Sequence, residues 1–98
     1  MVVGTLELEI FIPGSNSLKD KRQVVTSLRN KVRARFNVAV AEIDFQDKWQ
    51  RAVLGMATVN SCGGEIEAVF QKIKEVFEEN GDCFITSERK RIFQTEVD

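Results

Sequence analysis

The 98-residue chain contains no histidine and no tyrosine, one proline and two cysteines. Histidine is the side chain most often used for acid–base catalysis near neutral pH and as a metal ligand. Its absence excludes Ser–His and Cys–His catalytic pairs and histidine metal sites. Two cysteines without histidine make a poor zinc site, and the sequence has no cofactor fingerprint. We therefore expect no catalytic residue, no metal site and no cofactor.

Long apolar runs are missing as well. No stretch approaches the roughly 18 apolar residues that span a bilayer, and Glu7 and Glu9 interrupt the apolar N-terminal segment, which argues against a signal peptide. We expect a cytoplasmic protein with no membrane as a partner. Thiols stay reduced in that compartment. Cys62 and Cys83 also flank a predicted helix that is too long for a disulfide to bridge, so both should be free.

The apolar residues that are present recur with two periods, typical of strands and helices. Residues 2–12 alternate, with Leu8 and Ile10 on one side and Glu9 on the other, which predicts a half-buried strand. Ser17 and Asp20 form a capping box that begins a helix. That helix is predicted to run to about residue 36, where the next residue, an asparagine, suits the left-handed position that closes a helix.

The remaining residues predict two further strands, a second helix and a last strand. The strands cover about residues 38–45 and 50–59, with a turn between them. The second helix ends at Asn80-Gly81, because glycine takes a positive φ at little cost. The last strand covers about residues 83–95 and is expected to be bulged near Arg89-Lys90-Arg91.

The resulting order, βαββαβ, predicts the fold class. Residues 1–98 should form a single α+β domain of the ferredoxin-like kind, in which two helices cover one face of a four-stranded antiparallel sheet. The other face of such a sheet remains open. Glu7 and Glu9 point to that open face, where we expect them to lie opposite Arg51, Arg89 or Arg91.

The open face does not resemble an RNA-recognition sheet. Such a sheet stacks bases on aromatic residues of its central strands, whereas residues 51–57 contain none. Two exposed aromatic residues are nevertheless candidates for a protein contact: Phe11 on the first strand, and Trp49, the only tryptophan, beside Arg51 in the turn. Alternatively, Trp49 folds back to cap the edge of its own sheet.

The small net charge of −1 conceals an uneven distribution. Residues 18–36 hold seven basic residues and one acidic residue, so this segment carries +6 and the remainder −7. Basic helix flanks can follow a phosphate backbone. Alternatively, the long side chains are solvated and their stems cover apolar surface. If the first interpretation holds, the candidate nucleic-acid-binding residues are Lys19, Lys21, Arg22, Arg29 and Arg33.

Several blocks of the chain closely resemble the YlxP-like family, a bacterial family of small proteins of unknown function. These blocks are Ser17-Leu18-Lys19-Asp20-Lys21-Arg22, the segment 35–42 (RFNVAVAE), Gln46-Asp47 and Trp49-Gln50-Arg51-Ala52. The match extends over roughly residues 1–94. The resemblance implies a ferredoxin-like fold and a bacterial cytoplasmic protein. It also implies a gene neighbourhood of transcription-termination, translation-initiation and ribosome-maturation factors, and it supplies no catalytic residue.

These observations lead to two hypotheses from different classes. In the first, the protein is a non-enzymatic module that binds ribosomal RNA or another structured RNA through the basic first helix. In the second, it is a protein–protein or self-association module, a homodimer for example, that uses the open sheet face and the hairpin with Phe11, Trp49 and Arg51. A small-molecule ligand has the least support, because the sequence shows no site for one.

Overall fold

The computed structural model describes residues 1–96, and these contain four strands and two helices. The predicted order βαββαβ is confirmed. The elements are β1 (Val2–Phe11), α1 (Leu18–Arg35), β2 (Ala39–Asp44), β3 (Arg51–Asn60), α2 (Gly63–Glu79) and β4 (Phe84–Gln94).

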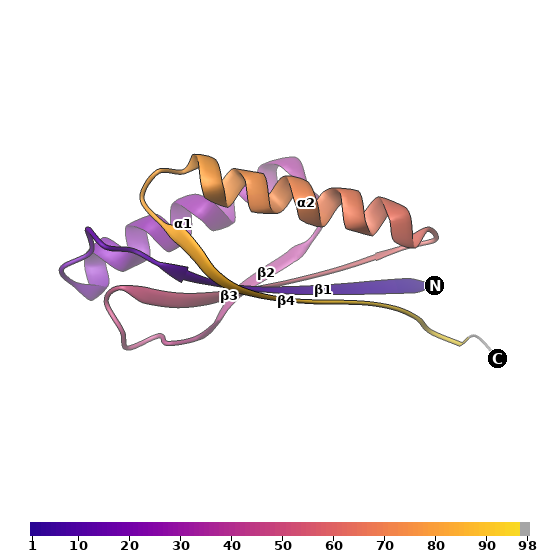
Figure 1. Ribbon diagram of the computed structural model, residues 1–98, viewed down its shortest axis with the longest axis horizontal. Helices are drawn as coiled ribbons and strands as arrows, with labels where there is room; N and C mark the ends of the chain where they lie inside the picture. Colours follow the sequence, from indigo (N-terminus) through magenta and orange to yellow (C-terminus); the bar gives the residue numbers. More distant parts are fainter. Residues whose placement is uncertain (97–98) are drawn as a thin grey trace.

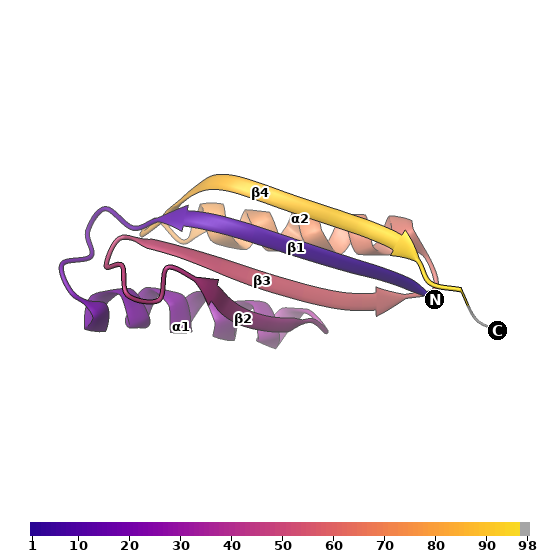
Figure 2. The ribbon, with the colours of Figure 1, turned by 90° about the horizontal axis from the view of Figure 1, so that it is seen from below.

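The four strands form one antiparallel sheet in the order β2-β3-β1-β4. Both helices lie on the same face of this sheet, as Figure 1 shows. The opposite face is open, and in Figure 2 it lies in front of the two helices. The predicted ferredoxin-like α+β fold is therefore confirmed. Neither helix in the described part of the chain has the length and apolar character that crossing a membrane requires.

The core lies between the sheet and the helices. Leu6, Leu8 and Ile10 of β1 are fully buried, whereas the alternate residues Glu7 and Glu9 are only half-buried on the open face. The predicted alternation is therefore confirmed. The helices contribute their own buried side chains, and each large apolar side chain taken out of water contributes about 1.5–3 kcal/mol. The largest of these from the helices are Leu28, Val32, Ile66, Phe70, Ile73 and Phe77.

The N-terminus of α1 has the predicted cap in a modified form. The Ser17 hydroxyl accepts a hydrogen bond from the Asp20 backbone N–H at 3.0 Å. The Asp20 carboxylate accepts from the N–H of Asn16 at 3.0 Å, one residue before the position that the capping box predicts. The first bond satisfies one of the amide groups that a helix start leaves without partners, and the second ties the preceding loop to the first turn of the helix.

The C-termini of the two helices differ from one another. The predicted left-handed Asn37 is wrong: α1 ends at Arg35, and Phe36 is already extended, with its N–H donating to the Val32 carbonyl at 2.9 Å. The Phe36 ring packs against the core, so the chain enters β2 without a left-handed residue. The predicted stop at Gly81 is confirmed by its φ of 79°.

The last strand is bulged, but not where the sequence predicts. The register between β1 and β4 shifts between Glu9 and Ile10, and Thr86 is the extra residue. The Thr86 hydroxyl explains this position, because it donates to the Glu9 carboxylate at 3.0 Å. The stretch from Arg89 to Arg91 pairs regularly with β1, so the expected bulge there is wrong.

Candidate polyanion-binding surface

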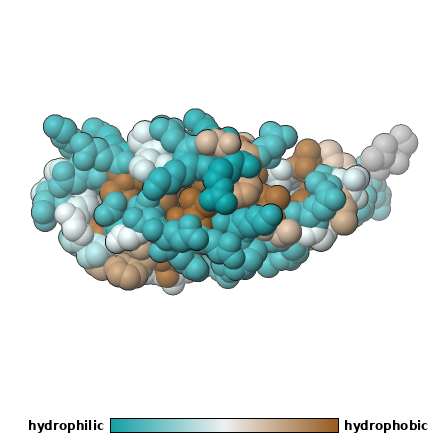
Figure 3. Space-filling view, turned by 90° about the horizontal axis from the view of Figure 1, so that it is seen from above, coloured by the Kyte–Doolittle hydropathy of each residue, from teal (hydrophilic) through white to brown (hydrophobic). Residues whose placement is uncertain are grey.

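Helix α1 presents its apolar stripe to the sheet and its polar sides to solvent. Val25, Leu28 and Val32 are buried beneath it. Figure 3, which views the molecule from the helix side, shows a mostly hydrophilic surface with apolar groups visible between the side chains. Most of the basic residues of α1 therefore lie on the flanks and the outer side of the helix.

The structure separates the five predicted nucleic-acid-binding residues. Lys19 and Arg22 are exposed and line one shallow hollow on the outer side of α1, together with Asn30. Arg33 is exposed as well, and its guanidinium donates to the Val40 carbonyl at 3.3 Å, which directs it toward β2. Arg29 is half-buried.

Lys21 does not belong to this surface. It is 1% exposed, and its ammonium group lies 2.8 Å from the Glu42 carboxylate and donates to the Phe45 carbonyl. The expectation that Lys21 contacts phosphates is therefore wrong, because a buried and paired ammonium cannot reach a ligand. The cause is a strand far along the chain, which places Glu42 beneath α1.

The other α1 cations have no such partner. Among residues 1–96, only four pairs of opposite charges lie within 4.0 Å of one another, and Lys21 is the single α1 residue among them. Lys31 bonds to the neutral Asn80 side chain at 2.7 Å. Six basic side chains on one helix thus carry charges that no described carboxylate compensates: Lys19, Arg22, Arg29, Lys31, Arg33 and Arg35.

The turn between β2 and β3 is the second place where predicted residues meet. Phe45 adopts a positive φ of 61°, and its carbonyl accepts from the Lys48 N–H at 2.9 Å as well as from Lys21. The Arg51 guanidinium lies 3.9 Å from the centre of the Phe45 ring and 3.3 Å from a Glu9 carboxylate oxygen. The expected contact between the β1 acids and Arg51 is confirmed.

The predicted protein-contact residues do lie together. Phe11, Trp49 and Arg51 line the same surface hollow. Trp49 is 55% exposed, so more than half of its surface is open to a partner. The sequence reasoning missed Phe84, which lies beside Phe11 in the β1–β4 register and is 62% exposed. Its place in the expected last strand was visible, but its face depends on the bulge at Thr86.

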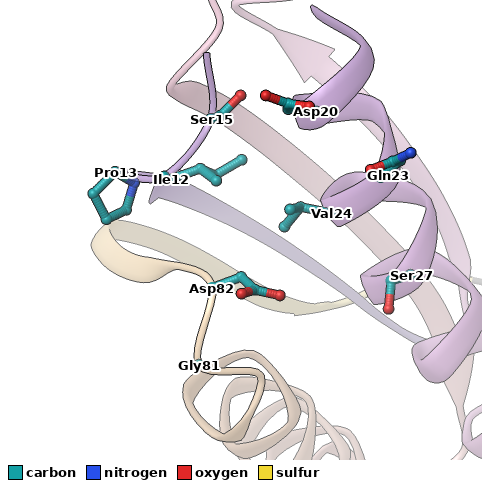
Figure 4. Close-up of a pocket in the computed structure, with 10 residues that line it drawn as sticks. Ile12, Pro13, Ser15, Asp20, Gln23, Val24, Ser27, Gly81 and Asp82 are labelled. Atoms are coloured by element: carbon teal, nitrogen blue, oxygen red, sulfur yellow. The ribbon is translucent and has the colours of Figure 1, made fainter. Parts of the chain in front are cut away.

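A cleft of about 460 Å³ between α1 and the loop before β4 was not predicted (Figure 4). Asp20, Gln23, Val24 and Ser27 of α1 line it on one side, and Asp82 faces them. The Asp20 carboxylate is already engaged with the backbone of the preceding loop. Within the described residues no group of three or more His, Cys, Asp or Glu side chains could hold a metal ion.

Both cysteines are free, as predicted. Cys62 is exposed, whereas Cys83 is buried and lies 3.6 Å from the Phe77 carbonyl, to which its thiol donates. Burial raises the pKa of the Cys83 thiol, and the nearby Asp82 carboxylate raises it further. Such a thiol remains protonated and is a poor nucleophile, so this arrangement offers no covalent chemistry.

Comparisons with known proteins place the chain among uncharacterised relatives. A family model described as "Protein of unknown function (DUF503)" matches residues 3–90. The "Uncharacterized protein YlxP" of Bacillus subtilis (strain 168) is 38% identical over 72 residues, which are 74% of this chain and 78% of that protein. A solved C-terminal segment of the alpha subunit of aIF2 from Pyrococcus abyssi matches 98% of this chain but only 52% of its own, with 15% identity and a TM-score of 0.45. A likeness of that degree supports no argument about function.

Proposed function

Because the chain belongs to the DUF503 family of YlxP-like proteins, which has no assigned function, we propose a function from its own surface: it is a non-enzymatic module that binds structured RNA through α1. This proposal rests on the six α1 cations that have no carboxylate partner among residues 1–96. Charges that are not compensated within the molecule are available to phosphates, and each phosphate contact releases counterions from the nucleic acid.

The chemistry of α1 favours contacts with the backbone rather than with bases. Its exposed polar side chains are mainly lysine and arginine, and it carries no aromatic residue on which a base could stack. Contacts of this kind position a protein on RNA without reading its sequence. The gene neighbourhood implied by the family resemblance favours ribosomal RNA over other polyanions.

The decisive test reverses two exposed charges of α1. The variant Lys19→Glu/Arg22→Glu is matched by Lys48→Glu/Lys72→Glu, which makes the same change in charge at exposed positions in the β2–β3 turn and on α2. Binding to ribosomal subunits is measured at several salt concentrations. The α1 variant should bind at least about tenfold more weakly. The slope of its log affinity against log salt concentration should fall by an amount that corresponds to about two fewer released ions.

The matched variant should retain most of the affinity and the wild-type salt dependence. Circular dichroism confirms that both variants are folded. Equal binding by the α1 variant and wild type, with an unchanged salt dependence, would contradict the proposal. Lys21 is unsuitable for this test, because reversing its buried charge would disturb the fold rather than the surface.

A second candidate function rests on the hollow formed by Phe11, Trp49 and Arg51. Exposed tryptophan and arginine are frequent anchors of protein interfaces, so this hollow fits a protein partner. Trp49 is the only tryptophan, and its fluorescence reports directly on the hollow. A blue shift on addition of a partner would favour this function, whereas binding of RNA through α1 should leave the emission unchanged.

A further inference from the structure

Strand β4 forms a long edge of the sheet. It has 11 residues, more than any other strand, and it pairs with β1 on one side only. Helix α2 lies on the face of the sheet, so within the described residues it leaves the outer side of β4 uncovered (Figure 2). The strand contains no proline, so every backbone N–H on its outer side is present and can donate to another strand. An edge of this kind can pair with another strand.

The sequence of β4 is suited to pairing with itself. It begins with Phe84-Ile85 and ends with Ile92-Phe93, and a charged segment separates the two apolar pairs. If two copies run antiparallel with Arg89 opposite Arg89, the bulge at Thr86 removes one residue from the register. Ile85 then lies opposite Ile92 of the second copy, and Phe84 lies opposite Phe93.

The faces of the sheet agree with this register. Ile85 and Ile92 pair with Ile10 and Gly4, which face the helices. Phe84 and Phe93 pair with Phe11 and Val3, which lie on the open face. Phe84 is 62% exposed and Phe93 is 39% exposed. Their contact would bury apolar surface that one copy leaves in water.

The charges on the helix side are complementary in the same register. Glu88 of one copy lies opposite Lys90 of the other. Within one copy, Glu88 is 3.1 Å from Lys74 and Lys90 is 2.8 Å from Glu67. The segment of α2 between Glu67 and Lys74 therefore runs alongside the part of β4 around Arg89. The twofold axis that brings Glu88 to Lys90 therefore also turns Glu67 of one α2 toward Lys74 of the other. Opposite charges face each other on both elements.

The open side carries the only like charges at the joint. On the twofold axis, Arg89 of one copy lies opposite Arg89 of the other, but each Arg89 has Glu7 beside it on β1. The neighbouring position pairs the small Ser87 with Arg91, and Ser87 lies beside Glu9 in the register with β1. Glu7 therefore offsets the repulsion between the two Arg89 side chains, and Arg91 faces a small neutral residue rather than another arginine.

We propose that β4 is a homodimer interface, in which two copies join edge to edge about a twofold axis at Arg89 and form one continuous eight-stranded sheet. This interface is distinct from the hollow at Trp49 and does not depend on binding of RNA. Because α1 lies beside β2, at the opposite edge of the sheet, the dimer leaves both basic helices exposed (Figure 2). A polyanion with two suitably spaced sites could then engage both helices.

The oligomeric state and its dependence on one exposed residue give the first test. Sedimentation at high micromolar concentration should give twice the chain mass of 11.1 kDa. Phe84→Asp should give monomers, because Phe84 is exposed in one copy and the new charge would lie against Phe93 of the second copy. Trp49→Ser is the control and should leave the dimer intact. A wild-type monomer, or a dimer that Trp49→Ser dissociates and Phe84→Asp does not, would overturn the proposal.

Disulfide trapping then tests the register. In a Cys62→Ser background, Arg89→Cys places two thiols directly opposite each other on the axis, where Cα atoms are about 5 Å apart. Ser87→Cys is the matched variant on the same face. Its thiols would be four positions apart along the strand, about 13 Å. Rapid oxidation to a covalent dimer is expected for Arg89→Cys alone, and equal rates for the two variants would contradict this register.

Discussion

Lys21 and Glu42 form an ion pair beneath α1, with 2.8 Å between the ammonium nitrogen and a carboxylate oxygen. The pair joins the first turn of α1 to β2, and the bond from Lys21 to the Phe45 carbonyl extends the link to the β2–β3 turn. A lysine that is 1% exposed is rare, because burying an ammonium is costly unless it is paired and hydrogen-bonded. Lys21 is therefore a structural residue, despite its place in the most basic segment of the chain.

Lys21→Ala should be strongly destabilising. The substitution leaves the Glu42 carboxylate without its cation and leaves a gap where the lysine stem packed. Loss of one partner of a buried pair costs about 3–5 kcal/mol, and we expect the lower end because the Glu42 side chain is 22% exposed. Urea unfolding measures the change in the free energy of unfolding.

The control for this prediction is two residues away on the same helix. Lys19 is exposed and lies outside every ion pair among the described residues, so Lys19→Ala should cost less than about 0.5 kcal/mol. Lys21→Met/Glu42→Gln should recover part of the loss, since no charge is then left without a partner. Equal costs at Lys19 and Lys21 would show that the pair contributes little.

Gly4 gives a second stability prediction, because helix α2 lies against β1 at this residue. A methyl group added there would lie 2.4 Å from Ile66 Cγ2 and 3.0 Å from the Phe70 ring. Gly4→Ala should therefore destabilise the fold by about 1–3 kcal/mol through overpacking. Gly14→Ala is the control, since nothing lies within 4 Å of the added group. Thermal unfolding compares the two, and a similar melting temperature for both would refute the close approach.

Features of the fold that depend on neighbouring residues could be predicted from the sequence, whereas features that depend on distant residues could not. The alternation of Leu8 and Glu9 and the glycine stop at Gly81 depend on neighbours in the sequence, and both were predicted correctly. The burial of Lys21 was not predicted. Helical periodicity places Lys21 on a basic flank of the helix, whereas its burial depends on Glu42, 21 residues later. The bulge at Thr86 likewise depends on a contact with Glu9, at the other end of the chain.

Arg51 supports a third prediction, on the turn that carries Trp49. Its guanidinium contacts the Phe45 ring and the Glu9 carboxylate, but its side chain is 49% exposed. Exposed ion pairs and cation–π contacts each contribute about 0.5–1 kcal/mol. Arg51→Met should therefore cost about 1 kcal/mol, and the cost should shrink when Glu9→Gln is already present. Chemical unfolding of the four proteins in this double-mutant cycle measures the coupling, and purely additive effects would show that the pair is not formed.

The two thiols should differ in reactivity. Cys62 is exposed, whereas Cys83 is buried and its pKa is raised, chiefly by burial. A colourless disulfide reagent that releases a coloured anion should therefore titrate one thiol in the native protein and both thiols in denaturant. Cys62→Ser should abolish the rapid reaction, and Cys83→Ala should leave it unchanged. Rapid reaction of both thiols under native conditions would show that Cys83 is accessible.

The raised pKa of Cys83 also predicts how stability depends on pH. In the unfolded chain the thiol ionises near its ordinary pKa of 9.0, whereas in the folded protein it holds its proton to higher pH. Below pH 9.0 both states carry the proton, so the thiol adds no pH dependence. As the pH rises from 9.0 toward the folded-state pKa, the unfolded state alone loses the proton, and the free energy of unfolding falls. Cys83→Ala should remove this part of the decline, whereas Cys62→Ser should not. Urea unfolding of the three proteins across this range measures it, and parallel curves for Cys83→Ala and wild type would contradict the assignment.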